Sequence, residues 1–113
     1  MKKLLPSLRE KKRYLVYEII SKKSINFQTA KKAIYDNISK MIGELELGKA
    51  GIQILPDYEM QKGIIKVSNK YLDKLRASLA LIDNINNNKV IVASRGVSGA
   101  INKARSKFMW GVK

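Results

Sequence analysis

Apolar residues in this chain alternate between runs typical of strands and stripes typical of helices. Residues 13–21 are almost continuously apolar and rich in aromatic and β-branched side chains, which predicts a central strand buried on both faces. Runs at 50–56 and 63–68 flank the segment DYEMQKG, which we expect to form the turn of a hairpin. Residues 89–95 have the same apolar character and predict the last strand.

The first helical stripe follows the first predicted strand. Its apolar positions are three or four residues apart, as on one face of a helix. Asn26 or Ser24 can cap its start through a side-chain oxygen, and Gly43 or Gly48 can end it. The stripe comprises Phe27, Ala30, Ile34, Ile38, Met41 and Leu45.

Two further helices are predicted in the second half of the chain. Ser68 or Asn69 can cap the first of them, and the asparagine-rich residues 84–88 that follow it predict a loop. A short terminal helix comes after the last strand. The two stripes are Leu72, Leu75, Leu79 and Ile82, and then Val97, Ile101, Ala104 and Phe108.

The order of these elements predicts an α+β fold in a single domain spanning residues 1–113. Strand, helix, strand, strand, helix, strand matches a split βαββαβ sandwich of the ferredoxin-like or RRM-like kind. We expect a four-stranded antiparallel sheet with two helices on one face, plus the short C-terminal helix. Right-handed crossovers bring the first and last strands side by side. The opposite face of the sheet is apolar enough to need a covering partner.

The net charge of the chain indicates the kind of partner that it binds. The chain has 23 Lys and Arg against nine Asp and Glu, a formal net charge of +14, and no anion from residue 84 to the end. Such an excess destabilises a compact domain by self-repulsion and favours a polyanionic partner, most often nucleic acid. A membrane surface is the rival interpretation. No apolar run is long enough for a signal peptide or a membrane span, so we expect a cytoplasmic protein.

The residues available for catalysis are few. The chain has no Cys and no His, which excludes disulfides, thiolate or imidazole metal sites and Cys- or His-dependent nucleophiles. Glu44 and Glu46 would point to different sides of a helix end, and Asp57 and Glu59 fall in the predicted hairpin turn, where acids aid solubility. We therefore predict no catalytic residue, no metal site and no bound cofactor.

Two activities that share this topology lack their key residues here. An RNA recognition motif stacks bases on strand aromatics, and the segment KGIIKVS from Lys62 has the right start but no aromatic. Tyr14 and Tyr17 are better explained as core or interface residues. Acylphosphatase needs a glycine-rich phosphate cradle after its first strand, and residues 21–24 (SKKS) contain no glycine.

Basic residues near both ends of the chain are the candidate RNA-binding residues, because the topology brings the two ends together. Lys103 and Lys107 share one side of the terminal helix, and Arg105 projects elsewhere. Ser98 and Gly99 at the helix entry either offer backbone N–H groups to a phosphate or simply cap the helix. The full candidate set is Arg9, Lys11, Lys12, Arg13, Arg95, Lys103, Arg105 and Lys107.

Two segments resemble a known family. LPSLREKKRYLVYEI (residues 5–19) and SRGVSGAINKARSKF (residues 94–108) resemble the N- and C-terminal signatures of archaeal ribonuclease P protein component 2. Their separation and the strand–helix order fit as well, so the resemblance covers nearly the whole chain. Ala100 stands where the family often has threonine, and a hydroxyl role at that position does not carry over.

The resemblance implies a non-catalytic RNA-binding subunit of the endonuclease that removes 5′ leaders from precursor tRNA. It implies that the ribonuclease P RNA and its Mg²⁺ ions carry the chemistry, that component 3 is the protein partner, and that precursor tRNA is met only through the complex. The residues alone leave open a basic structural protein, ribosomal or DNA-compacting, and self-association.

Overall fold

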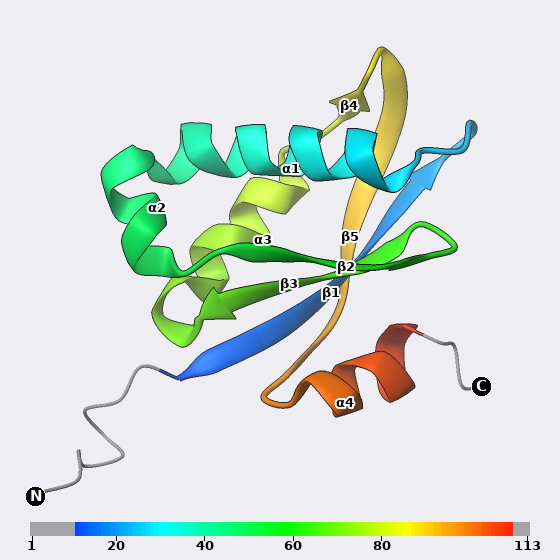
Figure 1. Cartoon of the computed structure of the whole chain (residues 1–113). Helices are drawn as coiled ribbons and strands as arrows, with labels where there is room; N and C mark the ends of the chain where they lie inside the picture. The colour runs from blue at the N-terminus through cyan, green and yellow to red at the C-terminus, as the bar shows by residue number, and fades with distance from the viewer. Residues whose placement is uncertain (1–10, 110–113) are drawn as a thin grey trace, which may run out of the picture.

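The computed structural model describes residues 11–109, which form a strongly twisted five-stranded antiparallel sheet with four helices (Figure 1). The strand order is β2-β3-β1-β5-β4. In chain order the elements are β1 Lys12–Ser21, α1 Phe27–Ile42, α2 Glu44–Ala50, β2 Gln53–Glu59, β3 Lys62–Ser68, the 3₁₀ turn η2 Asn69–Tyr71, α3 Leu72–Ala80, β4 Asn84–Ile85, β5 Asn88–Ser98, α4 Ile101–Ala104 and the π-helical turn η3 Arg105–Met109. No helix among these residues is long and apolar enough to cross a membrane.

The strand β1 is central, as its continuous apolar run predicts. It pairs antiparallel with β3 on one side and β5 on the other, so the first and last long strands are neighbours, as expected. Leu15, Val16 and Tyr17 are all fully buried. Because successive side chains point to opposite faces, both faces of the sheet must be covered at this point.

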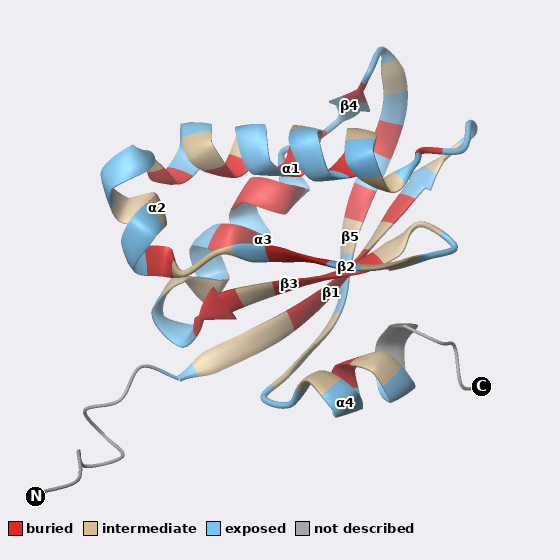
Figure 2. Cartoon of the chain, in the orientation of Figure 1, coloured by how far each residue is buried: buried red, intermediate tan, exposed pale blue. Residues whose placement is uncertain are grey.

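Helices α1 and α3 cover one face. Ile34 and Ile38 of α1 and Leu75 and Leu79 of α3 share a core with Leu15 of β1, which confirms the predicted packing of two helices on one face (Figure 2). Burying apolar surface of this kind contributes most of the stability of a small domain.

The ends of α1 follow from two local signals. The side chain of Asn26 accepts a hydrogen bond from the Thr29 backbone N–H at 2.9 Å, so Asn26 is the cap. The helix ends at Gly43, whose φ of 90° favours glycine. The buried stripe ends with Ile42, while Met41 and Leu45 are 47% and 89% exposed. The prediction that these two continue the stripe is wrong, because the chain turns at Gly43 and begins a separate helix.

A tyrosine in the core explains the glycine of β3. Tyr17 and Gly63 are partners across β1 and β3, and the Tyr17 ring lies directly over Gly63. A Cβ added at Gly63 would overlap the phenol ring, lying 2.8 Å from Cε2. The Tyr17 hydroxyl is buried without a hydrogen-bond partner among the described residues. Burial, with a smaller contribution from Tyr58, raises the pKa of this hydroxyl above its ordinary value.

The sheet has a fifth strand that the sequence did not predict. The residues expected to form a loop at 84–88 instead form a tight hairpin in which Asn84 pairs with Lys89 and Ile85 with Asn88. The two turn residues, Asn86 and Asn87, have φ of 54° and 67°, which asparagine tolerates well. The predicted four-stranded sheet is therefore wrong by one short edge strand.

The β2–β3 hairpin begins at Gln53 rather than at residue 50, and its turn is shorter than predicted. Its turn is only Met60 and Gln61, with φ of 52° and 61°, so Asp57 and Glu59 belong to β2 rather than to a turn. The Gln61 side chain holds the turn against the end of β1. Its amide accepts from the Ile25 N–H at 2.7 Å and donates to the Ile19 carbonyl at 2.6 Å.

The opposite face of the sheet is covered in part by the chain itself. Helix α4 lies across it, and Ala104 packs on Val16, Leu55 and Ile64 (Figures 1 and 2). The expectation that this face needs a covering partner is thus wrong for the part under α4. The helix is also shorter than expected, because β5 continues to Ser98 and includes Val97. The side chain of Phe108 lies outside the described part of the chain.

Candidate nucleic-acid interface

Arg13, at the start of β1, lies beside the entry to α4, whereas the ammonium of its neighbour Lys12 lies next to Gly51, just before β2. Tyr14 of β1 is paired with Ser98 of β5. The Arg13 guanidinium reaches Gly99, where an added Cβ would lie 3.1 Å from Nη1. Lys11 is exposed, and Lys12 and Arg13 are half-buried. The two ends of the chain therefore contribute to one surface.

Arg9 lies outside the described residues.

The Ser98 hydroxyl is engaged within the turn that leads into α4. Its Oγ accepts from the Ala100 N–H at 3.1 Å and donates to the Ala100 carbonyl at 3.0 Å. The Ser98 side chain does not cap α4 itself, because the N-cap residue is Ala100, which has no side-chain cap hydrogen bond. The two Ser98 hydrogen bonds hold the Gly99 backbone close to Arg13.

Arg95 is not at the end of the last strand but inside it. It is the extra residue at a β-bulge, where the pairing of β1 with β5 shifts between Val16 and Tyr17. Its Nε donates to the Glu18 carboxylate at 2.6 Å. The Arg95 charge is therefore largely balanced by an acid of the same chain.

Arg105 makes the more enclosed of the two arginine–carboxylate pairs. Its Nε and Nη2 donate to the two Asp57 carboxylate oxygens at 2.8 and 3.3 Å. The side chains are 32% and 16% exposed respectively. A bidentate pair of this kind is strong and directional, and it ties η3, just after α4, to β2. Asp57 thus has a structural role that a position in a turn did not suggest.

The two lysines near the C-terminus remain available to a partner. Lys103 on α4 and Lys107 on η3 are exposed, and neither makes an ion pair within residues 11–109. Two candidate arginines, Arg95 and Arg105, are thus held by acids, whereas Lys103 and Lys107 are exposed.

One basic residue of this surface was missed. Lys66 of β3 is the partner of Tyr14. Its neighbours Ile65 and Val67 point into the core under α1 and α3, so the alternation of side chains along a strand puts Lys66 on the other face, which carries α4. The signal was present in the alternation of residues 63–68. Lys66 extends the cationic surface from the start of β1 onto β3.

The carboxylates of the described residues are dispersed over the fold. No cluster of three or more Asp and Glu able to hold a metal exists within residues 11–109. Glu46 accepts a hydrogen bond from the Tyr71 hydroxyl, which joins α2 to η2. That bond, aided by Lys49 and Lys74, lowers the pKa of Glu46. The shift therefore has a structural cause.

Comparison with known proteins identifies the family to which this surface belongs. The sequence pattern of the Rpp14/Pop5 family matches residues 13–109, which include β1, the sheet and α4. This chain belongs to the Rpp14/Pop5 family. Its membership confirms the resemblance noted in the sequence.

Relatives within the Rpp14/Pop5 family agree over almost the full length. Ribonuclease P protein component 2 of Methanosarcina mazei is 38% identical over 96% of this chain and 93% of its own. The component 2 of Pyrococcus furiosus is 37% identical over 96% of this chain and 91% of its own. A chain in the structure of yeast ribonuclease MRP has the same fold, with a TM-score of 0.65 and 14% identity over 88% of this chain and 79% of its own.

Proposed function

We propose that this chain is a ribonuclease P protein subunit of the component 2 type. The observation that carries the proposal is the agreement with archaeal component 2 proteins over 96% of the chain. The cationic surface at the start of β1 and on α4 supports it, since a ribonucleoprotein subunit needs phosphate contacts. The alternative, a basic structural protein without a processing role, is not favoured by these relatives.

In this proposal the protein shapes RNA and does not cut it. The exposed lysines neutralise phosphates where RNA segments crowd together, which lowers the divalent-ion concentration needed to fold the catalytic RNA. Mg²⁺ bound to that RNA carries the hydrolysis of the precursor tRNA leader. Arg95 and Arg105 act mainly by holding the surface in shape through Glu18 and Asp57. Component 3 is the protein partner.

Reconstitution tests this function directly. The chain is added, with component 3, to the matching ribonuclease P RNA, and removal of the 5′ leader from precursor tRNA is measured over a Mg²⁺ titration. We expect cleavage at Mg²⁺ concentrations where the RNA alone is inactive. An unchanged Mg²⁺ requirement, or cleavage by the chain without the RNA, would contradict the proposal.

The exposed lysines make a separate prediction about salt dependence. Replacing Lys103 and Lys107 together by glutamine should reduce the slope of log K against log salt for RNA binding by about two units, one per phosphate contact. Lys40→Gln combined with Lys74→Gln, on the helices of the opposite face, is the matched control and should leave the slope unchanged. Equal slopes for the two double variants would remove Lys103 and Lys107 from the interface.

A further inference from the structure

The face that carries α4 continues beyond it as an uncovered apolar patch. Along β1, Val16 lies under α4, Glu18 pairs with Arg95, and Ile20 comes next on the same face. Ile20 is the partner of Ile91 on β5, and the two side chains are 44% and 63% exposed. Two β-branched residues side by side in the sheet are thus left open to solvent.

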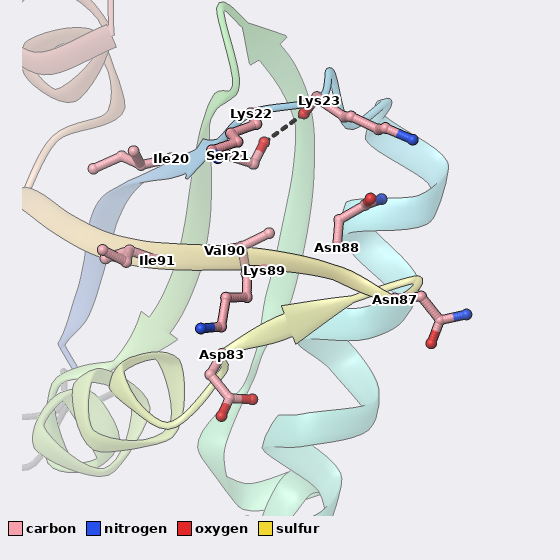
Figure 3. A pocket seen from close by; sticks show the side chains of 10 residues that line it. All are labelled: Ile20, Ser21, Lys22, Lys23, Asp83, Asn87, Asn88, Lys89, Val90 and Ile91. Carbon is pink, nitrogen blue, oxygen red and sulfur yellow. Dashed lines mark hydrogen bonds between the residues drawn. The ribbon is translucent and has the colours of Figure 1, made fainter.

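Ile20 and Ile91 are the exposed apolar side chains that line a hollow of about 730 Å³, and they are called its floor here. Figure 3 shows the charged residues that line it to one side of this floor: Lys22 and Lys23 just after β1, Lys89 on β5 and Asp83 just before β4, with the Lys23 side chain pointing away from the isoleucines. The tight β4–β5 turn makes up part of the wall, and the Asn87 N–H donates to the Asn84 side chain at 2.9 Å within it. This part of the wall is therefore formed by the chain itself, without a partner.

The charge around the hollow selects the partner. The rim has three lysines against one aspartate, and none of the three lysines makes an ion pair within the described part of the chain. An occupant with carboxylates is therefore complementary to this rim.

The residues that line the hollow favour a protein partner over a nucleic acid. No aromatic residue lines the hollow, so it offers bases nothing to stack on. Phosphate contact alone needs no apolar floor. An aliphatic floor within a charged rim is instead the arrangement that receives an anchoring side chain of a protein.

We propose that the Ile20–Ile91 patch is the docking site for an acidic protein segment of the same ribonucleoprotein, which places an aliphatic or aromatic side chain on the two isoleucines and carboxylates against Lys22 and Lys89. The inference rests on the proposed function, because it requires a protein partner in the complex. It places that partner at the opposite end of β1 from the cationic surface proposed to bind RNA.

The test measures binding of purified component 3 to the full chain by titration calorimetry, and of the ribonuclease P RNA by filter binding. The double variant Ile20→Thr/Ile91→Thr keeps β-branched side chains and adds no charge, so the strands should form as before. We expect it to weaken component 3 binding at least tenfold and to leave RNA affinity within twofold. Lys89→Gln should weaken component 3 binding about threefold and reduce its salt dependence.

Matched controls use apolar and basic residues far from the hollow. Met41→Gln/Leu45→Gln removes exposed apolar surface from α1 and α2, and Lys40→Gln removes a charge from α1; both should bind component 3 like the parent chain. Equal binding by Ile20→Thr/Ile91→Thr and the parent, or a loss of RNA affinity instead, overturns the docking site alone. No binding of component 3 by the parent chain overturns both the partner in the proposed function and the docking site.

Discussion

Gly63→Ala destabilises the protein by about 3 kcal/mol, the upper end of the usual cost of overpacking a core. The new methyl group would occupy the space of the Tyr17 ring. Tyr17 is fully buried between the sheet and the helices, so it has no solvent-facing position to which it can move. The measurement is the free energy of unfolding from urea denaturation followed by circular dichroism.

Two variants isolate the cause of this loss. Gly48→Ala introduces the same methyl group within α2, where nothing lies within 4 Å of it, and should stabilise the protein by about 0.5–1 kcal/mol through helix propensity. Adding Tyr17→Leu to Gly63→Ala should cost less than the sum of the two single changes, because the smaller side chain makes room. Additive costs would show that the ring and the glycine are not in conflict.

Asp57→Asn should lower the free energy of unfolding by about 2 kcal/mol and loosen the C-terminal segment. The change removes the charge from a hydrogen-bonded pair whose members are largely enclosed, and hydrogen bonds to charged groups contribute about 1.5–3 kcal/mol. Once η3 is released from β2, α4 no longer covers Val16 and Ile64. Hydrogen exchange of residues 101–109 should rise more than that of β1.

The second arginine pair provides the comparison. Glu18→Gln breaks the ion pair with Arg95, whose side chain is 45% exposed, and should cost about 1 kcal/mol or less because solvent screens it. Lys103→Gln/Lys107→Gln should leave stability unchanged while altering the salt dependence of RNA binding. An equal loss for Asp57→Asn and Glu18→Gln would mean that the Arg105 pair does not hold the C-terminal segment in place.

Local sequence signals predicted the elements whose causes are local. The almost continuously apolar residues 13–21 predicted the central strand, and Asn26 was one of two residues, with Ser24, predicted to cap α1. The stripes of α1 and α3 identified the helix-covered face. The prediction of a loop at residues 84–88 failed because asparagines fit several kinds of turn. Composition alone does not distinguish the tight hairpin that Asn86 and Asn87 form from an open loop.

The charge of the sequence predicted the candidate site, but tertiary contacts decide which of its cations are already paired with acids. The excess of Lys and Arg and the meeting of the two chain ends follow from composition and strand order, and Arg13 beside Gly99 agrees with them. Which cations remain available does not follow, because Arg95 meets Glu18 across 77 residues of sequence and Arg105 meets Asp57 across 48. Sequence spacing has no information on such pairs.

The sequence by itself determined the central strand, the order of the long strands and helices, the positive charge and the family. Only the tertiary structure decided that α4 covers part of the open face, that two arginines are already paired and that Ile20 and Ile91 remain uncovered. The physical reason is that periodicity records which side of an element is apolar, whereas the partner of a charge or an apolar patch is whatever distant segment the fold brings against it.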